Sequence, residues 1–134
     1  MSRLRPERSN RRYERGSASI QLVILLPALF AILFLGMQAA LHHHARTVAI
    51  AAAQEGARAA AAEYGQSADG ISGANSFIAE AGGNDVLPGS SASITRTATT
   101  VTVTVTGHSL SVIPGWHPTI RQSASAPIEQ ITAP

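Results

Sequence analysis

An uncharged apolar run occupies residues 22–37, interrupted only by Pro27 and Gly36. With Ile20 and Leu41 as its outer limits, the run approaches the roughly twenty residues with which a helix crosses a bilayer. We therefore predict a membrane-spanning or signal segment here, rather than a helix of a water-soluble core. Pro27 removes one backbone hydrogen bond and is expected to bend the helix, which membrane helices tolerate.

The helix is predicted to continue beyond the apolar run. Residues 45–63 are mostly Ala, the strongest helix former. Ser17 or Ser19 is suited to cap the start of the helix, and Gly65 provides the first C-terminal stop after Tyr64. We expect one continuous helix, half of it in lipid and half outside.

Further along the chain the pattern changes to that of strands. Residues 66–75 are rich in Gly and Ser and predict a linker, followed by a short helix that ends at Gly82. From Ser91 onward apolar and polar positions alternate, as in strands with one buried face. Two strands joined near residues 97–99 and a third over residues 119–126 would form an antiparallel sheet.

These elements predict an α+β fold: a long N-terminal helix, a short helix and a small antiparallel sheet of about three strands. The predicted organisation is an unstructured basic cytoplasmic leader over residues 1–16, a transmembrane helix over 17–41, its extracytoplasmic continuation over 42–65, and a small extracytoplasmic α+β domain over 66–134. The Val-rich sheet face needs an apolar cover, expected from Val48, Ile50, Tyr64, Phe77 and Trp116. So small a core is marginally stable alone, which favours a partner surface.

Charge is distributed unevenly along the chain. Residues 1–15 hold six Arg against two Glu, a formal charge of +4, whereas the remainder holds four Arg against six acids, a charge of −2. Cationic flanks stay on the cytoplasmic side of a membrane, so we predict the N-terminus inside and the C-terminus outside. The arginines lack interleaved aromatic residues and a basic domain behind them, which disfavours a nucleic-acid partner.

The basic segment ends in Gly16, and small and apolar residues follow at once. If Ser17 is counted as a new first residue, Gln21 is the fifth. This start resembles the leader of type IV prepilins, in which a membrane-embedded aspartyl peptidase cuts after Gly and the fifth mature residue is normally Glu. The resemblance implies cleavage between Gly16 and Ser17, with Gln21 at the acid position. An amide there hydrogen-bonds the new amine without neutralising it. The alternative is that Gly16 is an ordinary flexible residue before a membrane helix.

A longer stretch carries a more specific resemblance. RGSASIQLVILLPALFAILFLG followed by ARTVAIAAAQEGARAAAAEYG is similar to the TadE-like family of tight-adherence (Tad/Flp) pilus assembly proteins, or pseudopilins. The shared features are the Gly-small-small-apolar start, LP within the membrane run, and EGARAAA, over about residues 15–65. The resemblance implies a non-enzymatic, single-pass protein of the bacterial cell membrane, processed by the prepilin peptidase. Its implied partners are other pilin-like subunits or Tad assembly proteins.

Small residues recur every four positions in the Ala-rich part of the helix. Such rows allow another helix to approach closely. We predict that they pack against helices of other subunits in a homo- or hetero-oligomer, the alternative being that Ala is abundant only because it favours helix. The predicted packing residues are Ala45, Ala49, Ala53, Gly56, Ala57, Ala60 and Ala61.

The polar side chains indicate neither catalysis nor a cofactor. His42, His43 and His44 are neighbours on a helix and point about 100° apart, so they do not converge on a metal ion and instead suggest interfacial anchoring. The acids lie in segments predicted to be flexible, without a paired His or nucleophile: Asp69, Glu80 and Asp85.

Two further functions stay open on the sequence. The first is a secreted soluble protein with a cleaved signal peptide, although the apolar run exceeds the usual length and the cleavage candidates near Ala45 fit poorly. The second is a membrane-anchored ligand-binding module, which the low aromatic content disfavours.

Overall fold

A computed structural model describes residues 10–130 and divides the chain into two compact units, Met1–Gly36 and Met37–Pro134. The elements in order are α1 (Asn10–Ala61), α2 (Ser67–Ala81), the short 3₁₀ helix η1 (Gly83–Asp85), β1 (Ser91–Arg96), β2 (Thr100–His108) and β3 (Thr119–Pro127). This composition confirms the predicted α+β fold with a long N-terminal helix, a second helix and three antiparallel strands.

Helix α1 begins earlier and ends earlier than the sequence pattern predicted. It starts at Asn10, so the last part of the predicted unstructured leader is helical, while its first nine residues lie outside the described part of the chain. The reason lies in composition, because no Gly or Pro separates Asn10 from Gly16.

Tertiary hydrogen bonds satisfy carbonyl groups at and just beyond the C-terminal end of α1 at Ala61. The Arg96 guanidinium donates to the carbonyl oxygens of Ala60 and Gly65 at 3.3 and 3.1 Å. The Glu129 amide donates to the Ala61 carbonyl at 2.9 Å. Carbonyls that lack intrahelical donors at a helix end are thus satisfied by β1 and by the segment after β3.

Helix α2 replaces most of the predicted linker, so that prediction was wrong. The Asp69 carboxylate accepts a hydrogen bond from the Gln66 amide at 2.7 Å, which stabilises the first turn. Gly70 disfavours a helix in isolation, yet here it allows close contact with α1, since a Cβ on Gly70 would lie 2.8 Å from the Ala60 Cβ. Glycine in this segment therefore reflects helix packing rather than a flexible connection.

The sheet has the order β1-β2-β3 and is antiparallel throughout. Ile94 pairs with Val103, and Val103 pairs with Ala124 on the other side, so these residues share one face. The opposite face is a layer of Ser and Thr hydroxyls that bond across strands, as in the 2.8 Å contact between Thr104 and Ser123. The strands predicted from the two-residue alternation are confirmed.

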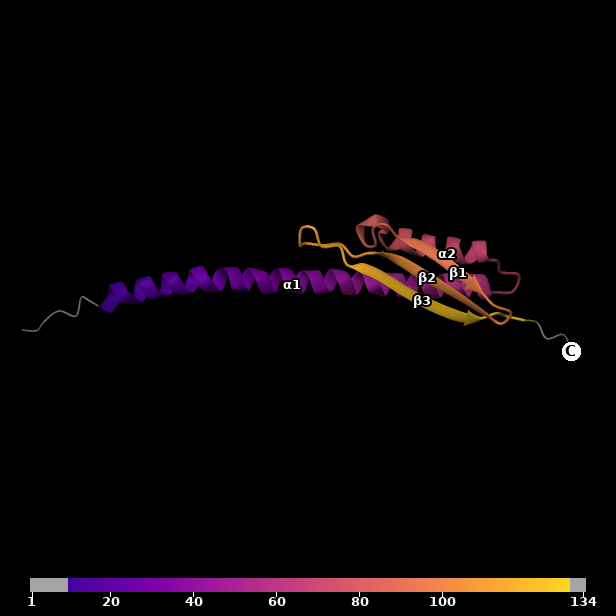
Figure 1. Cartoon of the computed structure of the whole chain (residues 1–134), viewed down its shortest axis with the longest axis horizontal. Helices are drawn as coiled ribbons and strands as arrows, with labels where there is room; N and C mark the ends of the chain where they lie inside the picture. Colours follow the sequence, from indigo (N-terminus) through magenta and orange to yellow (C-terminus); the bar gives the residue numbers. More distant parts are fainter. Residues whose placement is uncertain (1–9, 131–134) are drawn as a thin grey trace, which may run out of the picture. The chain divides into compact units, whose positions relative to one another are not determined.

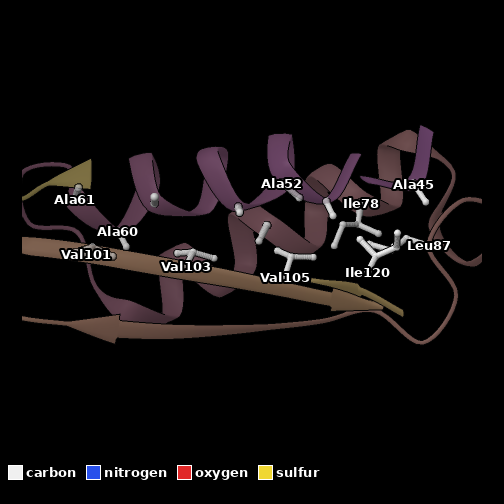
Figure 2. Close-up of a cluster of buried hydrophobic side chains, with 14 residues drawn as sticks. Ala45, Ala52, Ala60, Ala61, Ile78, Leu87, Val101, Val103, Val105 and Ile120 are labelled. Atoms are coloured by element: carbon white, nitrogen blue, oxygen red, sulfur yellow. The ribbon is translucent and has the colours of Figure 1, made fainter. Parts of the chain in front are cut away.

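Both helices pack on the Val face of the sheet in the C-terminal unit (Figures 1 and 2). A Cβ on Gly56 would meet the Gly70 carbonyl oxygen at 2.7 Å, the Ala74 Cβ at 3.1 Å and a Val103 methyl at 3.3 Å. Helix α1, helix α2 and β2 therefore meet at Gly56. The small side chains of the two helices let the larger valines of β2 fill the space between the layers.

The expected cover of the Val face was only partly right. Val48 is buried, but Ile50 is 37% exposed, Trp116 is 49% exposed and Tyr64 is 89% exposed. Alanines of α1 form most of the cover instead, because an Ala row allows the helix backbone to lie close to the sheet. Tyr64 has a φ of 61° beyond the end of α1, where its ring contributes nothing to the core.

We expect Gly56→Ala to destabilise the C-terminal unit. The added methyl gains up to about 1 kcal/mol of helix propensity. Its 2.7 Å approach to the Gly70 carbonyl oxygen forces a backbone shift, and overpacking of this kind costs about 1–3 kcal/mol. Urea unfolding of the detergent-solubilised full chain should show a lower midpoint. Gly36→Ala is the matched control, because a Cβ at Gly36 meets nothing within 4 Å, and its midpoint should not fall.

Candidate membrane and processing site

An exposed, uncharged surface covers α1 from Gly16 to Met37, and it is apolar from Leu22 onward. Val23 is 73% exposed and even the ring of Phe34 is 47% exposed. This part of α1 is about 33 Å long at 1.5 Å per residue, close to the thickness of a bilayer's hydrocarbon core. By length and composition, α1 is the one described helix suited to cross a membrane.

Pro27 lies inside this surface, and the helix continues through it. Its ring nitrogen has no proton, so the Val23 carbonyl lacks its usual helical donor. Apolar side chains on both sides of Pro27 line a shallow open groove: Leu22, Leu25, Leu26, Ala28, Leu29 and Ile32. The predicted bend at Pro27 stays a prediction.

The predicted cleavage pair lies within α1, where Gly16 and Ser17 are both exposed. A Cβ added at Gly16 would meet nothing within 4 Å, so packing does not explain the glycine. Gln21 is also exposed, four residues after Ser17. Residues four apart lie on one face of a helix, which places the Gln21 amide near the amine that cleavage would create.

The predicted packing rows are buried inside this chain. The side chain of Ala53 is 0% exposed and that of Ala57 is 1% exposed, both in the core beneath the sheet and α2. Burial extends to the whole predicted set: Ala45, Ala49, Ala53, Gly56, Ala57, Ala60 and Ala61. In this fold the rows pack α1 against the sheet and α2 of the same chain.

The outer face of the same helix half is polar. Arg46, Gln54, Glu55 and Arg58 are exposed there. Arg58 and Glu55 form an ion pair at 3.4 Å, of the exposed kind that contributes little to stability. This face therefore differs in character from the apolar surface of Gly16–Met37.

The described His, Asp and Glu side chains do not assemble into a metal centre. Among residues 10–130, no three His, Cys, Asp or Glu side chains are grouped closely enough to hold a metal ion. Asp69 caps α2 and Glu80 lies within α2, so the prediction that these acids occupy flexible segments was wrong. Asp85 belongs to η1.

Gln38 is the residue that the sequence analysis missed. Its side chain is only 3% exposed. Its Nε2 donates to the Leu110 carbonyl at 3.2 Å, and its Oε1 accepts from the Val112 amide at 3.0 Å. One side-chain amide thus holds α1 to the β2–β3 loop, residues 109–118. The only local signal was a polar residue directly after an apolar run.

These features define an α+β protein with one N-terminal helix suited to membrane anchoring. A family model described as "TadE-like protein" matches residues 16–58, which confirms the resemblance to TadE-like proteins over that segment. The match begins at Gly16 and takes in the apolar surface and most of the Ala-rich part of α1. TadE-like proteins are a pilus-associated structural family that is not known for enzymatic activity. No curated protein and no solved structure matches the chain.

Proposed function

We propose that the chain is a single-pass, pilin-like subunit of a Tad pilus assembly or secretion system in a bacterial cell membrane. The observation that carries the proposal is the uncharged, exposed surface of Gly16–Met37 between a basic leader and a folded α+β unit. The charge asymmetry supports a cytoplasmic N-terminus and an extracytoplasmic C-terminal unit.

Gln38 supports an earlier end of the lipid-spanning stretch than the predicted residue 41. Both functional atoms of its amide bond to the β2–β3 loop, and its burial is due to the C-terminal unit rather than to lipid. The segment before it is already long enough to span the hydrocarbon core. We place the outer membrane boundary at Met37.

Contacts with other subunits are proposed to use the exposed apolar part of α1. The Ala rows are occupied by the chain's own sheet and α2, whereas the groove beside Pro27 is open. After cleavage, Gln21 would accept a hydrogen bond from the Ser17 amine of its own chain or of a neighbour. Such a bond orients the helix start without neutralising its charge.

The secreted alternative is disfavoured by the position of its cleavage site. A cut after Ala45 would fall inside α1 and would remove Gln38 from the C-terminal unit. The Leu110 carbonyl and the Val112 amide would then lose their bonds to the Gln38 amide. A signal peptide would therefore take part of the fold with it.

A single introduced cysteine tests the anchoring and its orientation, because the chain contains no cysteine. Ser76 is exposed on α2. We expect Ser76→Cys in intact spheroplasts to react fully with a membrane-impermeant maleimide, and the protein to stay in the membrane after alkaline carbonate extraction. Labelling that requires lysis would contradict the orientation, and release by carbonate would contradict the anchor.

A further inference from the structure

The β2–β3 loop is an uncharged and partly apolar exposed segment. Residues 109–118 contain no Asp, Glu, Lys or Arg. Leu110 is 37% exposed and Trp116 is 49% exposed, while Ile113 is half-buried. The outward sheet face, by contrast, carries Ser and Thr. Exposed apolar residues gathered in one short loop indicate contact with an apolar phase or a partner.

The loop presents Trp116 from an ordered turn. The Trp116 amide donates to the Ile113 carbonyl at 3.3 Å across Pro114 and Gly115, and Gly115 has a φ of 76°. Proline followed by a residue with positive φ is the sequence of a type II turn. The Ser111 hydroxyl bonds to both the amide and the carbonyl of Ile113, at 3.1 and 2.8 Å. These hydrogen bonds fix the backbone from which Trp116 projects.

The loop is bound to α1 where the apolar surface ends. Gln38, which holds Leu110 and Val112, directly follows Met37, the last residue of the Gly16–Met37 surface. If α1 crosses a bilayer up to Met37, Gln38 lies at the level of the lipid headgroups, together with the loop backbone at Leu110 and Val112 that it holds. Tryptophan prefers this layer, because its ring is apolar and its N–H is polar.

We propose that the β2–β3 loop is a second membrane contact, in which Trp116 and its apolar neighbours enter the headgroup layer and the Gln38 amide sets their depth. The inference rests on the proposed anchoring by α1. A loop fixed in the interface stops the C-terminal unit from pivoting on the single helix. It thereby determines which surfaces of the unit face away from the membrane.

Trp116 is the only tryptophan of the chain, so its fluorescence reports on the loop directly. The full-length protein is reconstituted into phosphatidylcholine vesicles and purified by flotation. Its Trp116 emission is then compared between vesicles whose lipids carry bromine near the headgroup and vesicles whose lipids carry bromine near the end of the acyl chain. We expect loss of Trp116 fluorescence, largest with bromine near the headgroup, and weak quenching by aqueous acrylamide. The control is the double variant Trp116→Phe with Tyr64→Trp. Tyr64 is 89% exposed and lies just after the C-terminal end of α1, far along the chain from Gln38. Bromine should therefore leave the indole emission of the Tyr64→Trp variant unchanged.

The outcomes separate the two proposals. Protein that does not float with the vesicles overturns the anchor and the loop contact together. Protein that floats but shows no bromine quenching overturns the loop contact alone. A blue-shifted emission without bromine quenching means that a second copy covers the loop, which also overturns it. Gln38→Leu should float normally with weaker bromine quenching; unchanged quenching would refute the role of Gln38.

Discussion

Gly16→Leu is expected to abolish removal of the basic leader, so that the protein accumulates at its full unprocessed mass. A prepilin-type peptidase requires a small residue before the scissile bond, and a branched side chain there blocks its access. The structure makes this substitution a clean test, because a Cβ at Gly16 meets nothing within 4 Å. Misfolding is therefore no alternative explanation for a loss of processing. Mass spectrometry and N-terminal sequencing of the membrane-extracted protein measure the result.

Gly36→Leu is the matched control for that experiment. It makes the same change in the same helix, also with nothing within 4 Å of the new Cβ, and should leave processing intact. The unsubstituted protein should begin at Ser17. A start at Met1 or Ser2 would reduce Gly16 to an ordinary helix residue, and a start after Ala45 would establish the secreted alternative. Normal mature size in Gly16→Leu would show that the peptidase does not recognise this glycine.

The parts of the fold that could be predicted from sequence are those with a local period. The alternation of Val101, Val103 and Val105 with threonines indicates a strand whatever it packs against, and the apolar run indicates a helix. Helix α2 could not be predicted in this way. Gly70 is unfavourable in an isolated helix, and its place in α2 is explained by close packing: a Cβ there would lie 2.7 Å from an Ile94 methyl and 2.8 Å from the Ala60 Cβ. The low helix propensity of glycine was overridden here by packing between α2 and other elements of the fold.

The candidate site likewise has parts that the sequence alone predicts and parts that only the fold brings together. Gly16, Ser17 and the apolar surface are contiguous, so their relation is visible in the sequence. Gln38 and the β2–β3 loop are more than seventy residues apart, and two hydrogen bonds that only the fold creates join them. The Ala rows show a third case: their spacing predicted close packing without saying which surface packs there. The partner is the chain's own Val face and α2.

Ala53→Leu combined with Ala57→Leu is expected to unfold the C-terminal unit. Both positions are at most 1% exposed in the core, so each leucine would force three additional carbon atoms into a packed interior. Overpacking costs about 1–3 kcal/mol at each site, occasionally more, against a total domain stability of about 5–15 kcal/mol. The two positions share one ridge, so their effects need not add. Loss of the cooperative urea transition, followed by Trp116 fluorescence, would show the collapse.

Gln54→Leu combined with Arg58→Leu is the control that gives this result its meaning. It places two leucines on the same helix with the same four-residue spacing, but at exposed positions, and gives up only the exposed ion pair with Glu55. We expect this variant to fold. Ala53→Leu with Ala57→Leu acts on the fold itself. If the protein with these two buried substitutions fails to co-purify with other subunits, the cause is therefore unfolding rather than a lost interface. Substitutions that test assembly belong in the exposed apolar part of α1. An unchanged urea transition of the Ala53→Leu, Ala57→Leu protein would contradict the tight packing of the Ala rows within the chain.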